Sequence, residues 1–344
     1  MPQTPVPLST VRSGRIAVLR WSLALPAAVL LALAAPPSWA AQPAVGVVQN
    51  FGPNLKATCP NPEGIAVDPT GNLYAASFAF APVANICVIS PDQQVVDVIP
   101  VPAGPAGDAA LLGELFEPSQ GLYAVDFANG RAPNGRLLRI DPATHAITIL
   151  ATGFQAANAI AQDRHRNLFV SDSFAGTITK VAPDGSASQV WASSSLLTTR
   201  GFPPFGANGV AFDRNESFLY VANTGDSRVL RIPVEADGSA GPIEVFAQGS
   251  PTTQVLHGAD GVMFDVRGNL YVCANQANEV QVLDPSGQLI ARYKGTGASA
   301  FDFPASLVFH ERALYVTNLS LSDSGVNSRL SVLGVPFPGL PLRP

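Results

Sequence analysis

One pattern of apolar and polar residues recurs along most of the chain. Each copy begins with a glycine or small residue, continues with an alternating apolar stretch, turns near an aspartate and returns in a second apolar stretch. The clear copies are EGIAVDPTGNLYAAS from 63, NAIAQDRHRNLFVSDS from 158, NGVAFDRNESFLYVANT from 208 and DGVMFDVRGNLYVCAN from 260, and the weaker copies are QGLYAVDFANG from 120 and ASLVFHERALYVTN from 305. A two-residue period predicts β-strands, so each copy is a hairpin.

A second hairpin follows most copies. It consists of two short β-rich stretches joined by turn residues, as in ITKVAPDGSASQVW and VQVLDPSGQLIARY. The copies start about 50 residues apart, so each repeat supplies four strands. Six such repeats predict an all-β fold, a six-bladed β-propeller with four antiparallel strands per blade. We expect a single propeller domain over residues 41–335, because no linker interrupts the repeat.

The two ends of this domain predict how the ring closes. The last repeat has only three clear strands, whereas an unpaired strand, AVGVVQNF, lies at residues 44–51. We expect this N-terminal strand to join the last blade as its outer strand, which removes two exposed sheet edges. The Pro-rich residues 336–344 are predicted to form an extended C-terminal tail on the surface.

The first forty residues have the pattern of a cleaved signal peptide. Three arginines precede an apolar run from Trp21 to Ala35, and Ser38-Trp39-Ala40 forms a small-x-small cleavage signal. The run is shorter than the roughly 20 residues that span a bilayer, which disfavours the alternative of a membrane anchor. We therefore expect residues 1–40 to be removed near Ala40, giving a secreted or periplasmic protein with no membrane span.

Composition and cysteine content narrow the function classes. The chain is 47% hydrophobic and 13% charged with a net charge of −5, which indicates a globular protein and disfavours nucleic-acid binding. We expect a monomer. Cys59 and Cys87 either form a disulfide or remain free, and the odd Cys273 stays unpaired within the chain. The absence of a CxxC spacing disfavours a zinc or redox site.

The residues before the repeat glycines are the candidates for chemistry. In a blade, the start of the inner strand, the end of the second strand and the crossover to the next blade lie on one face. The pre-glycine residues should therefore meet around the channel, and they are Glu63, Gln120, Asn158, Asn208, Asp260 and Ala305. Asn and Asp could simply start strands as turn formers. That alternative does not explain two carboxylates converging in a narrow channel, where an uncompensated charge is costly.

A divalent cation would compensate these charges. Oxygen donors without histidine or thiolate indicate Ca²⁺, which takes 6–8 oxygens. An ion held by four protein groups keeps positions for water and substrate, which is typical of a catalytic metal.

The repeats resemble the gluconolactonase and regucalcin family of six-bladed calcium propellers, also called the senescence-marker-protein/gluconolactonase family. The resemblance covers residues 61–318 and rests on NPEG at 61, GANGVAFDRNESFLYVANT at 206 and GADGVMFDVRGNLYVCAN at 258. It implies that Glu63, Asn158, Asn208 and Asp260 hold the metal. Sugar-lactone members of the family carry an arginine and an acid where this chain has Ala156 and Ala159, so the resemblance does not extend to sugar-acid specificity.

Loop residues on the same face suggest the substrate. Phenylalanines are expected in the crossovers and in the loops between second and third strands, namely Phe78, Phe80, Phe116, Phe174, Phe202, Phe205, Phe301 and Phe303. Each could merely anchor its loop, but together they predict an apolar mouth. Gln120, Arg200, Phe202, Phe205 and Phe303 are the candidate pocket residues, with Arg200 either pairing with a substrate anion or solvated.

These expectations define a function and its alternatives. We expect an exported Ca²⁺-dependent hydrolase of apolar lactones or esters, in which the metal polarises the carbonyl and holds the attacking water. Asp260 is the candidate catalytic base, and His257 is either a reserve base, a fifth ligand or an ordinary loop histidine. Ser77, Asp172, Asn223, Asn275 and Asn318 close the second strands, either as turn caps or as groups that orient the ligands. Phosphotriesterase or arylesterase activity, or a binding propeller without catalysis, remains open.

Overall fold

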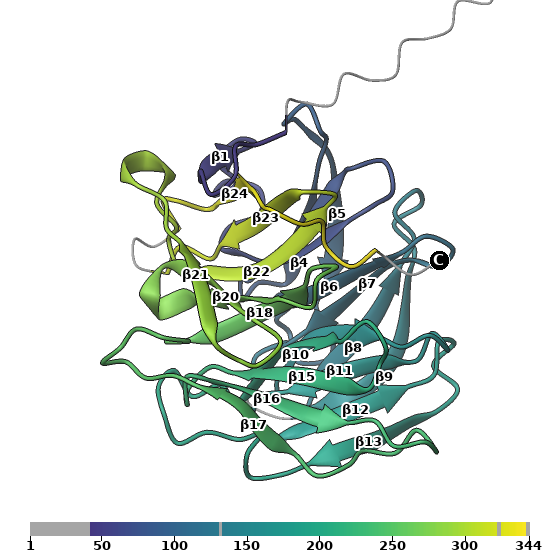
Figure 1. The fold of residues 1–344 in the computed structure, drawn as a ribbon. Coiled ribbons are helices and arrows are strands. Elements are labelled where there is room, and N and C mark those ends of the chain that lie inside the picture. Colours follow the sequence, from purple (N-terminus) through teal and green to yellow (C-terminus); the bar gives the residue numbers. More distant parts are fainter. Residues whose placement is uncertain (1–41, 131–132, 322–324, 342–344) are drawn as a thin grey trace, which may run out of the picture. The chain divides into compact units, whose positions relative to one another are not determined.

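The computed structural model describes residues 42–130, 133–321 and 325–341. The predicted signal peptide and the start at Ala41 lie outside the described residues. The described chain forms six antiparallel four-stranded sheets and two short 3-10 helices, η1 (Asn275–Ala277) and η2 (Gly297–Ser299). This confirms the predicted six-bladed β-propeller (Figure 1).

The first three blades follow one another in sequence. Blade 1 comprises β2 (Pro62–Val67), β3 (Leu73–Ser77), β4 (Val83–Ile89) and β5 (Val95–Pro102). Blade 2 comprises β6 (Leu111–Glu117), β7 (Gly121–Asp126), β8 (Gly135–Ile140) and β9 (Ile147–Phe154). Blade 3 comprises β10 (Ala157–Gln162), β11 (Leu168–Asp172), β12 (Thr177–Val181) and β13 (Ser188–Ser193).

The last three blades complete the ring. Blade 4 comprises β14 (Ala207–Phe212), β15 (Phe218–Asn223), β16 (Arg228–Pro233) and β17 (Glu244–Gln248). Blade 5 comprises β18 (Ala259–Phe264), β19 (Leu270–Ala274), β20 (Glu279–Leu283) and β21 (Leu289–Tyr293). Blade 6 comprises β22 (Pro304–His310), β23 (Ala313–Asn318), β24 (Arg329–Gly334) and β1 (Gln49–Phe51).

Ring closure uses the N-terminal strand, as predicted. β1 pairs antiparallel with β24, with Gln49 opposite Val332 and Phe51 opposite Leu330 (Figure 1). The regular strand is shorter than the predicted 44–51, although Val45 makes an isolated bridge to Gly334. The inner strand β2 of blade 1 contacts the inner strand β22 of blade 6, which closes the ring on the channel side as well.

The hydrophobic core lies between neighbouring blades. Six clusters of buried side chains each combine residues of two adjacent sheets; Ile86 of blade 1, for example, packs in one cluster with Leu111 and Leu138 of blade 2. These side chains are removed from water only when the next blade is in place, so the blades stabilise one another. The ring is therefore a rigid frame for any side chain that points into its channel.

The turns between the first two strands of a blade depend on the repeat aspartates. Asp68 Oδ1 accepts hydrogen bonds from the backbone N–H groups of Thr70 and Asn72 at 2.8 and 3.0 Å. Asp163 and Asp265 make the equivalent bonds in blades 3 and 5. The aspartate of the repeat thus closes a tight turn and stands at the end of the channel away from the start of the inner strands.

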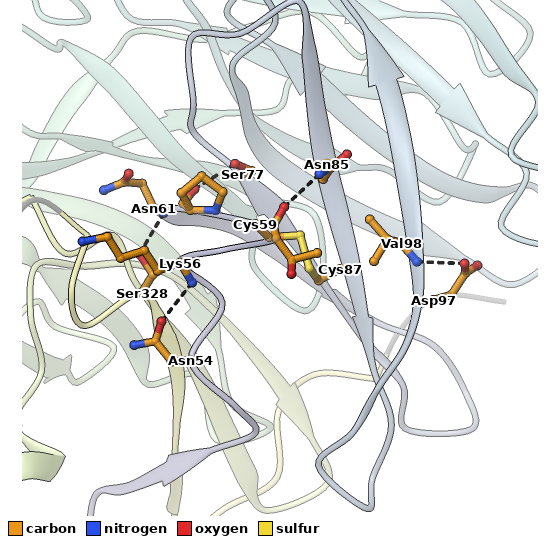
Figure 2. The surroundings of a disulfide bond; sticks show 12 residues. Asn54, Lys56, Cys59, Asn61, Ser77, Asn85, Cys87, Asp97, Val98 and Ser328 are labelled. Carbon is orange, nitrogen blue, oxygen red and sulfur yellow. Dashed lines mark hydrogen bonds between the residues drawn. A yellow bond between two sulfur atoms is a disulfide. The ribbon is translucent and has the colours of Figure 1, made fainter.

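A disulfide joins Cys59 and Cys87, which decides between the two states that the sequence left open. Their Cα atoms are 6.1 Å apart, and Cys273 is a buried free thiol. Figure 2 shows the disulfide and the nearby side chain of Asn85. Asn85 Nδ2 donates a hydrogen bond of 2.8 Å to the carbonyl of Thr58, the residue before Cys59. Together they tie the segment between β1 and β2 to β4, so the junction of blades 6 and 1 is cross-linked.

The C-terminal residues lie across the strand ends opposite the candidate site. The Leu340 N–H donates to the carbonyl of Phe264, and the Val266 N–H donates to the carbonyl of Pro338. Leu340 and Pro341 line a cavity of about 330 Å³ with apolar side chains of the inner strands, including Phe116, Phe212, Met263 and Phe309. The tail as far as Pro341 therefore lines part of this end of the channel.

Candidate metal centre

A β-bulge in every inner strand places one residue per blade at the channel. In β2 the pairing with β3 shifts between Pro62 and Ile65, so Glu63 and Gly64 form the irregular pair. The same shift occurs in β6, β10, β14, β18 and β22. A bulge bends the strand and redirects a side chain. We call the first residue of each irregular pair the ring position, and the six ring positions are Glu63, Leu112, Asn158, Asn208, Asp260 and Ala305.

The prediction for blade 2 was wrong. Gln120 does not begin the inner strand; it lies in the turn between β6 and β7, at the end opposite the ring positions. Its Oε1 accepts a hydrogen bond of 3.0 Å from Arg139 Nη1. The stretch that follows Gln120 is the second strand of the blade, and LLGELFE at 111–117 is the inner strand. The ring therefore has four polar residues and two apolar ones, Leu112 and Ala305.

Glycine after the ring position allows neighbouring inner strands to approach closely. A Cβ atom at Gly64 would lie 2.1 Å from the carbonyl oxygen of Leu112, and a Cβ at Gly209 would lie 2.3 Å from that of Asp260. Both distances are far below van der Waals contact. The glycines thus make the channel narrow enough for ring side chains from different blades to face one cavity.

The four polar ring residues line a single small cavity. Its volume is about 80 Å³. Only 3–5% of the surface of each ring residue is exposed to solvent for Glu63, Asn158, Asn208 and Asp260. The remaining lining residues are Phe78, Leu112, Pro203, Phe205, Thr224, Asn275, Phe303, Leu319 and Leu321. The cavity therefore has a polar floor and mainly apolar walls. The structure brings the four candidate ligands together, and their binding of a metal stays a prediction.

Hydroxyl groups fix the orientation of the two asparagines. Asn158 Nδ2 donates to Ser173 Oγ at 3.1 Å, and Ser173 Oγ donates to the Ala207 carbonyl at 2.6 Å. One blade further on, Asn208 Nδ2 donates to Thr224 Oγ1 at 2.9 Å, and Thr224 Oγ1 donates to the Ala259 carbonyl at 2.8 Å. Because each accepting carbonyl precedes the ring residue of the next blade, the hydroxyls link neighbouring ring positions.

Asn275 directly follows the second strand of blade 5, just as Ser173 and Thr224 follow the second strands of blades 3 and 4. Its side chain binds the Asp260 carboxylate. Asn275 Nδ2 donates to Asp260 Oδ2 at 2.7 Å. Space for Asn275 comes from Gly258, where a Cβ atom would lie 2.0 Å from Asn275 Oδ1. Of the two open interpretations of Asn275, the orienting one is therefore correct.

The other residues that close the second strands bind backbone groups of the crossovers. Asn223 Nδ2 donates to the carbonyls of Leu196 and Thr198 at 3.0 and 2.9 Å, and Asp172 accepts from the N–H of Gln155 and Ala156. Ser77 and Asn318 make similar contacts. These four residues are turn and crossover caps, as the first interpretation proposed.

Four oxygen atoms of residues that line the cavity are buried and have no hydrogen-bond partner. Three belong to ring residues, namely Glu63 Oε2, Asn158 Oδ1 and Asp260 Oδ1, and the fourth is Asn275 Oδ1. Buried polar atoms in proteins are nearly always paired, so an unpaired group of acceptors facing one cavity suits a cation. Within the described part of the chain, no three His, Cys, Asp or Glu residues gather as a metal-binding group, so a metal here depends on the asparagines.

Burial perturbs both carboxylates, and repulsion by neighbouring acids adds to its effect on Glu63. Burial raises the pKa of Asp260 to about 7, against the lowering effect of hydrogen bonds from Asn275 and Asn208. Burial, with added repulsion from Asp260 and Glu114, raises the pKa of Glu63 well above its usual value. Burial, followed by the charges of Asp260 and Glu63, raises the pKa of the Cys273 thiol as well. The site therefore disfavours negative charge unless a cation is present.

His257 lies outside the cavity lining. It is half-buried, its Nδ1 is 3.4 Å from Gln254 Oε1, and burial lowers the pKa of its imidazole. The structure therefore places it in the approach loop to β18 and does not place it against the four oxygen donors.

The predicted pocket residues divide into two groups. Phe205 and Phe303 line the cavity, whereas Phe202 is 79% exposed and Arg200 is also exposed, both outside the lining. Phe116 was placed on the wrong face: it belongs to β6 and lines the cavity at the opposite end of the channel. Sequence reasoning missed Phe127, which contacts four other phenylalanines at the mouth.

The fold and this site define a six-bladed propeller with a polar channel centre, and comparisons agree with that description. Residues 204–320 match the family model described as SMP-30/gluconolactonase/LRE-like region. This match confirms the resemblance inferred from the repeats. No curated protein matches the chain.

Solved structures similar to the chain share its fold at low sequence identity. A gluconolactonase of Xanthomonas campestris is 19% identical with a TM-score of 0.60, over 88% of this chain and 99% of its own. The calcium-binding protein regucalcin of Agrobacterium tumefaciens is 17% identical with a TM-score of 0.59, over 84% and 95%. A luciferin-regenerating enzyme is 18% identical with a TM-score of 0.62, over 86% and 97%.

Proposed function

We propose that the protein is an exported Ca²⁺-dependent hydrolase that cleaves the lactone or ester bond of a small apolar molecule. The observation that carries the proposal is the group of three unpaired, buried oxygens of Glu63, Asn158 and Asp260 at one cavity. Similarity to a gluconolactonase and to a calcium-binding regucalcin supports it.

Calcium suits the donors that the cavity offers. In the described part of the chain, the polar lining groups are carboxylates, amides and one hydroxyl, and no imidazole or thiolate is among them. Hard oxygen donors favour Ca²⁺. Glu63 and Asp260 would balance its charge, and Asn158 and Asn208 would supply neutral oxygens. Four ligands from the protein leave coordination positions for water and a substrate carbonyl.

Bound calcium would polarise the substrate carbonyl and increase the acidity of water. The chain supplies the remaining functions. In this proposal Asp260 is the proton acceptor as well as a ligand: Asn275 fixes its Oδ2, and its Oδ1 has no protein partner. The apolar walls formed by Leu112, Phe205 and Phe303 exclude bulk water, which strengthens electrostatic interactions inside the cavity. We assign no direct role to His257, since it does not line the cavity.

Arylesterase or phosphotriesterase activity in the same cavity is the second candidate. The specific observation in its favour is the group of phenylalanine side chains at the mouth, which suits an aromatic leaving group.

The test combines metal analysis with a substrate panel. Purified protein is assayed for bound calcium and then for hydrolysis of aliphatic lactones, aryl esters and paraoxon-type triesters, with and without a chelator. Chelator-sensitive lactone hydrolysis supports the first candidate, and preference for aryl esters or triesters supports the second. Hydrolysis that is insensitive to chelator contradicts the role of calcium. No hydrolysis and no bound calcium would leave a propeller that binds a ligand without catalysis.

Export and the monomeric state are parts of the same proposal. The disulfide between Cys59 and Cys87 supports an oxidising compartment. No helix in the described ranges has the length and apolar character to span a bilayer. Mass spectrometry of the protein recovered outside the cytoplasm should give a start near Ala41, and light scattering should give the mass of one chain. An intact N-terminus there would contradict cleavage.

A further inference from the structure

The cavity is too small to hold a whole substrate. Its volume is about 80 Å³, whereas sites for drug-sized ligands occupy about 300–1,000 Å³. Only the reacting group of a lactone or ester fits against the four oxygen donors. The rest of the molecule must lie at the mouth, so the residues there decide which substrates are accepted.

Five phenylalanine side chains form a continuous surface from the cavity wall to the solvent. We call them the phenylalanine cluster, and they are Phe78, Phe80, Phe127, Phe174 and Phe205. Ring centroids of touching members are 5.0 to 6.1 Å apart. Phe78 and Phe205 line the cavity, whereas Phe80 is 54% and Phe174 is 37% exposed. Contiguous exposed apolar groups beside a polar cavity are typical of a ligand site.

Phe127 is the centre of this cluster and is rigidly held. Its ring contacts the other four, and it is 5% exposed. The preceding Asp126 pairs with buried Arg136 and accepts hydrogen bonds from the N–H groups of Ala110 and Ala128 at 3.0 and 2.8 Å. A Cβ atom at Gly130 would lie 2.4 Å from the Phe127 ring, so glycine leaves space for it. The cluster is therefore preorganised.

The cavity has few hydrogen-bonding groups for a hydroxylated substrate besides its oxygen donors. Apart from the four ring residues, Thr224 and Asn275, the lining consists of phenylalanine, leucine and proline side chains. Each sugar hydroxyl placed against them would lose its hydrogen bonds to water without replacement, which strongly disfavours binding. An alkyl chain at the same place gains from leaving water.

We propose that the phenylalanine cluster is the subsite for an alkyl substituent of the substrate, so that the protein acts on alkyl-substituted lactones and rejects polyhydroxylated ones. This inference rests on the proposed hydrolysis and names its substrate class. The alkyl chain lies along Phe78, Phe80 and Phe174, whose rings pack on the buried Phe127, while the lactone carbonyl occupies the cavity.

The test uses a series of γ-lactones with unbranched alkyl substituents of increasing length, together with glucono-1,5-lactone, at saturating calcium. We expect kcat/KM to rise about fourfold per added methylene, the factor that corresponds to ~0.8 kcal/mol for each buried CH₂. The double variant Phe80→Ser, Phe174→Ser should flatten this rise to less than about twofold per methylene. The rate with the unsubstituted lactone, which has no chain to bury against these rings, should change less than the rate with the longest alkyl chain. Both side chains are substantially exposed, so their replacement does not open a cavity in the core.

Phe337→Ser is the matched control. Phe337 is 39% exposed, close to the value for Phe174, but it lies on the C-terminal tail over Arg267. Its variant should keep the full dependence on chain length. If kcat/KM does not rise with chain length in the unmodified protein, or if glucono-1,5-lactone is the best substrate, the proposed alkyl subsite is wrong. The proposed hydrolysis would still stand.

If the protein hydrolyses none of these lactones, the proposed function fails and binding decides the subsite separately. Calorimetric titration with a lactone that carries a six-carbon chain should then show binding to the unmodified protein and at least tenfold weaker binding to the double variant. No binding, or equal binding to both proteins, overturns the subsite.

Discussion

Asn158 donates its side-chain N–H to Ser173 Oγ, and this bond determines which atom of the amide faces the cavity. With Nδ2 engaged at 3.1 Å, Oδ1 remains without a partner beside Glu63 and Asp260. An amide turned the other way would present a donor, which repels a cation. Ser173 thus makes Asn158 an oxygen donor, although Ser173 does not line the cavity itself.

Removing this hydroxyl should weaken calcium binding. In Ser173→Ala the amide of Asn158 loses its fixed orientation, and loss of such a supporting contact typically costs about 10- to 100-fold in metal affinity. Calcium titration followed by calorimetry measures the change. Ser188→Ala, an exposed serine of β13 in the same blade, is the control and should bind as the unmodified protein does. Equal affinity in Ser173→Ala would contradict the orienting role.

Replacing Asp260 by asparagine should have opposite effects on the two forms of the protein. Asn is close in shape to Asp but uncharged, so it removes the repulsion that raises the pKa of Glu63. Above pH 7 the metal-free variant should be more stable than the unmodified protein, by about 1–3 kcal/mol. It should also bind calcium at least about tenfold more weakly, since one anionic ligand is gone. Denaturant unfolding with chelator and calcium titration measure the two effects.

His257→Ala is the companion variant for Asp260, and it should leave calcium content unchanged. Since His257 does not line the cavity, hydrolysis should fall by less than about tenfold, compared with the 10²–10⁴-fold typical of a lost general base. Loss of calcium from His257→Ala would show that the histidine belongs to the metal site after all.

Stability of the metal-free protein should depend on pH in a defined direction. The pKa of Asp260 is raised to about 7 by burial, whereas in the unfolded chain it returns to about 3.9. The contribution of Asp260 is therefore fully present below pH 4 and is lost as the pH rises towards 7. Calcium should remove this loss, because it stabilises the ionised form. Thermal unfolding from pH 5 to 8, with chelator and with calcium, should give diverging melting temperatures as the pH rises.

The disulfide should stabilise the junction of blades 6 and 1. Cys59 and Cys87 are 28 residues apart, and closing a loop of that length is worth about 3–4 kcal/mol in the chain-entropy model. The double variant Cys59→Ser, Cys87→Ser should therefore unfold at lower denaturant concentration. Calcium affinity should change little, because neither cysteine lines the cavity. An unchanged unfolding midpoint would show that the cross-link carries no stability.

The sequence repeat predicted five of the six ring positions because the alternating strands of the inner hairpin recur at an equivalent place in five blades. Blade 2 departs from this pattern: its inner strand, LLGELFE, has no turn aspartate, so the second strand after Gln120 was mistaken for it. In the structure successive ring positions are 45 to 52 residues apart along the chain. Leu112 fits this spacing, whereas Gln120 does not.

Contacts between side chains of different blades could not be predicted from the sequence. Phe127 lies beside Phe78 and Phe205 only because three blades meet at the mouth, and no periodicity along the chain shows this. For Ser173 and Thr224 a signal did exist, since both directly follow the second strand of their blade. Aligning the repeats one residue beyond the strand would have placed them with Asn275.

Gly209 should be essential for the approach of blades 4 and 5. In Gly209→Ala the added Cβ would meet the carbonyl oxygen of Asp260 at 2.3 Å, so the inner strands must separate. Because that shift moves Asn208 away from Asp260, calcium affinity should fall with stability, the latter by about 1–3 kcal/mol as for other overpacked sites. The control is Ala159→Gly, since blade 3 carries alanine at this position and already accommodates its methyl group. It should keep calcium affinity and lose only about 1 kcal/mol of stability from the added backbone freedom. Calcium binding by Gly209→Ala equal to that of the unmodified protein would contradict the view that close strand contact brings the ring residues together.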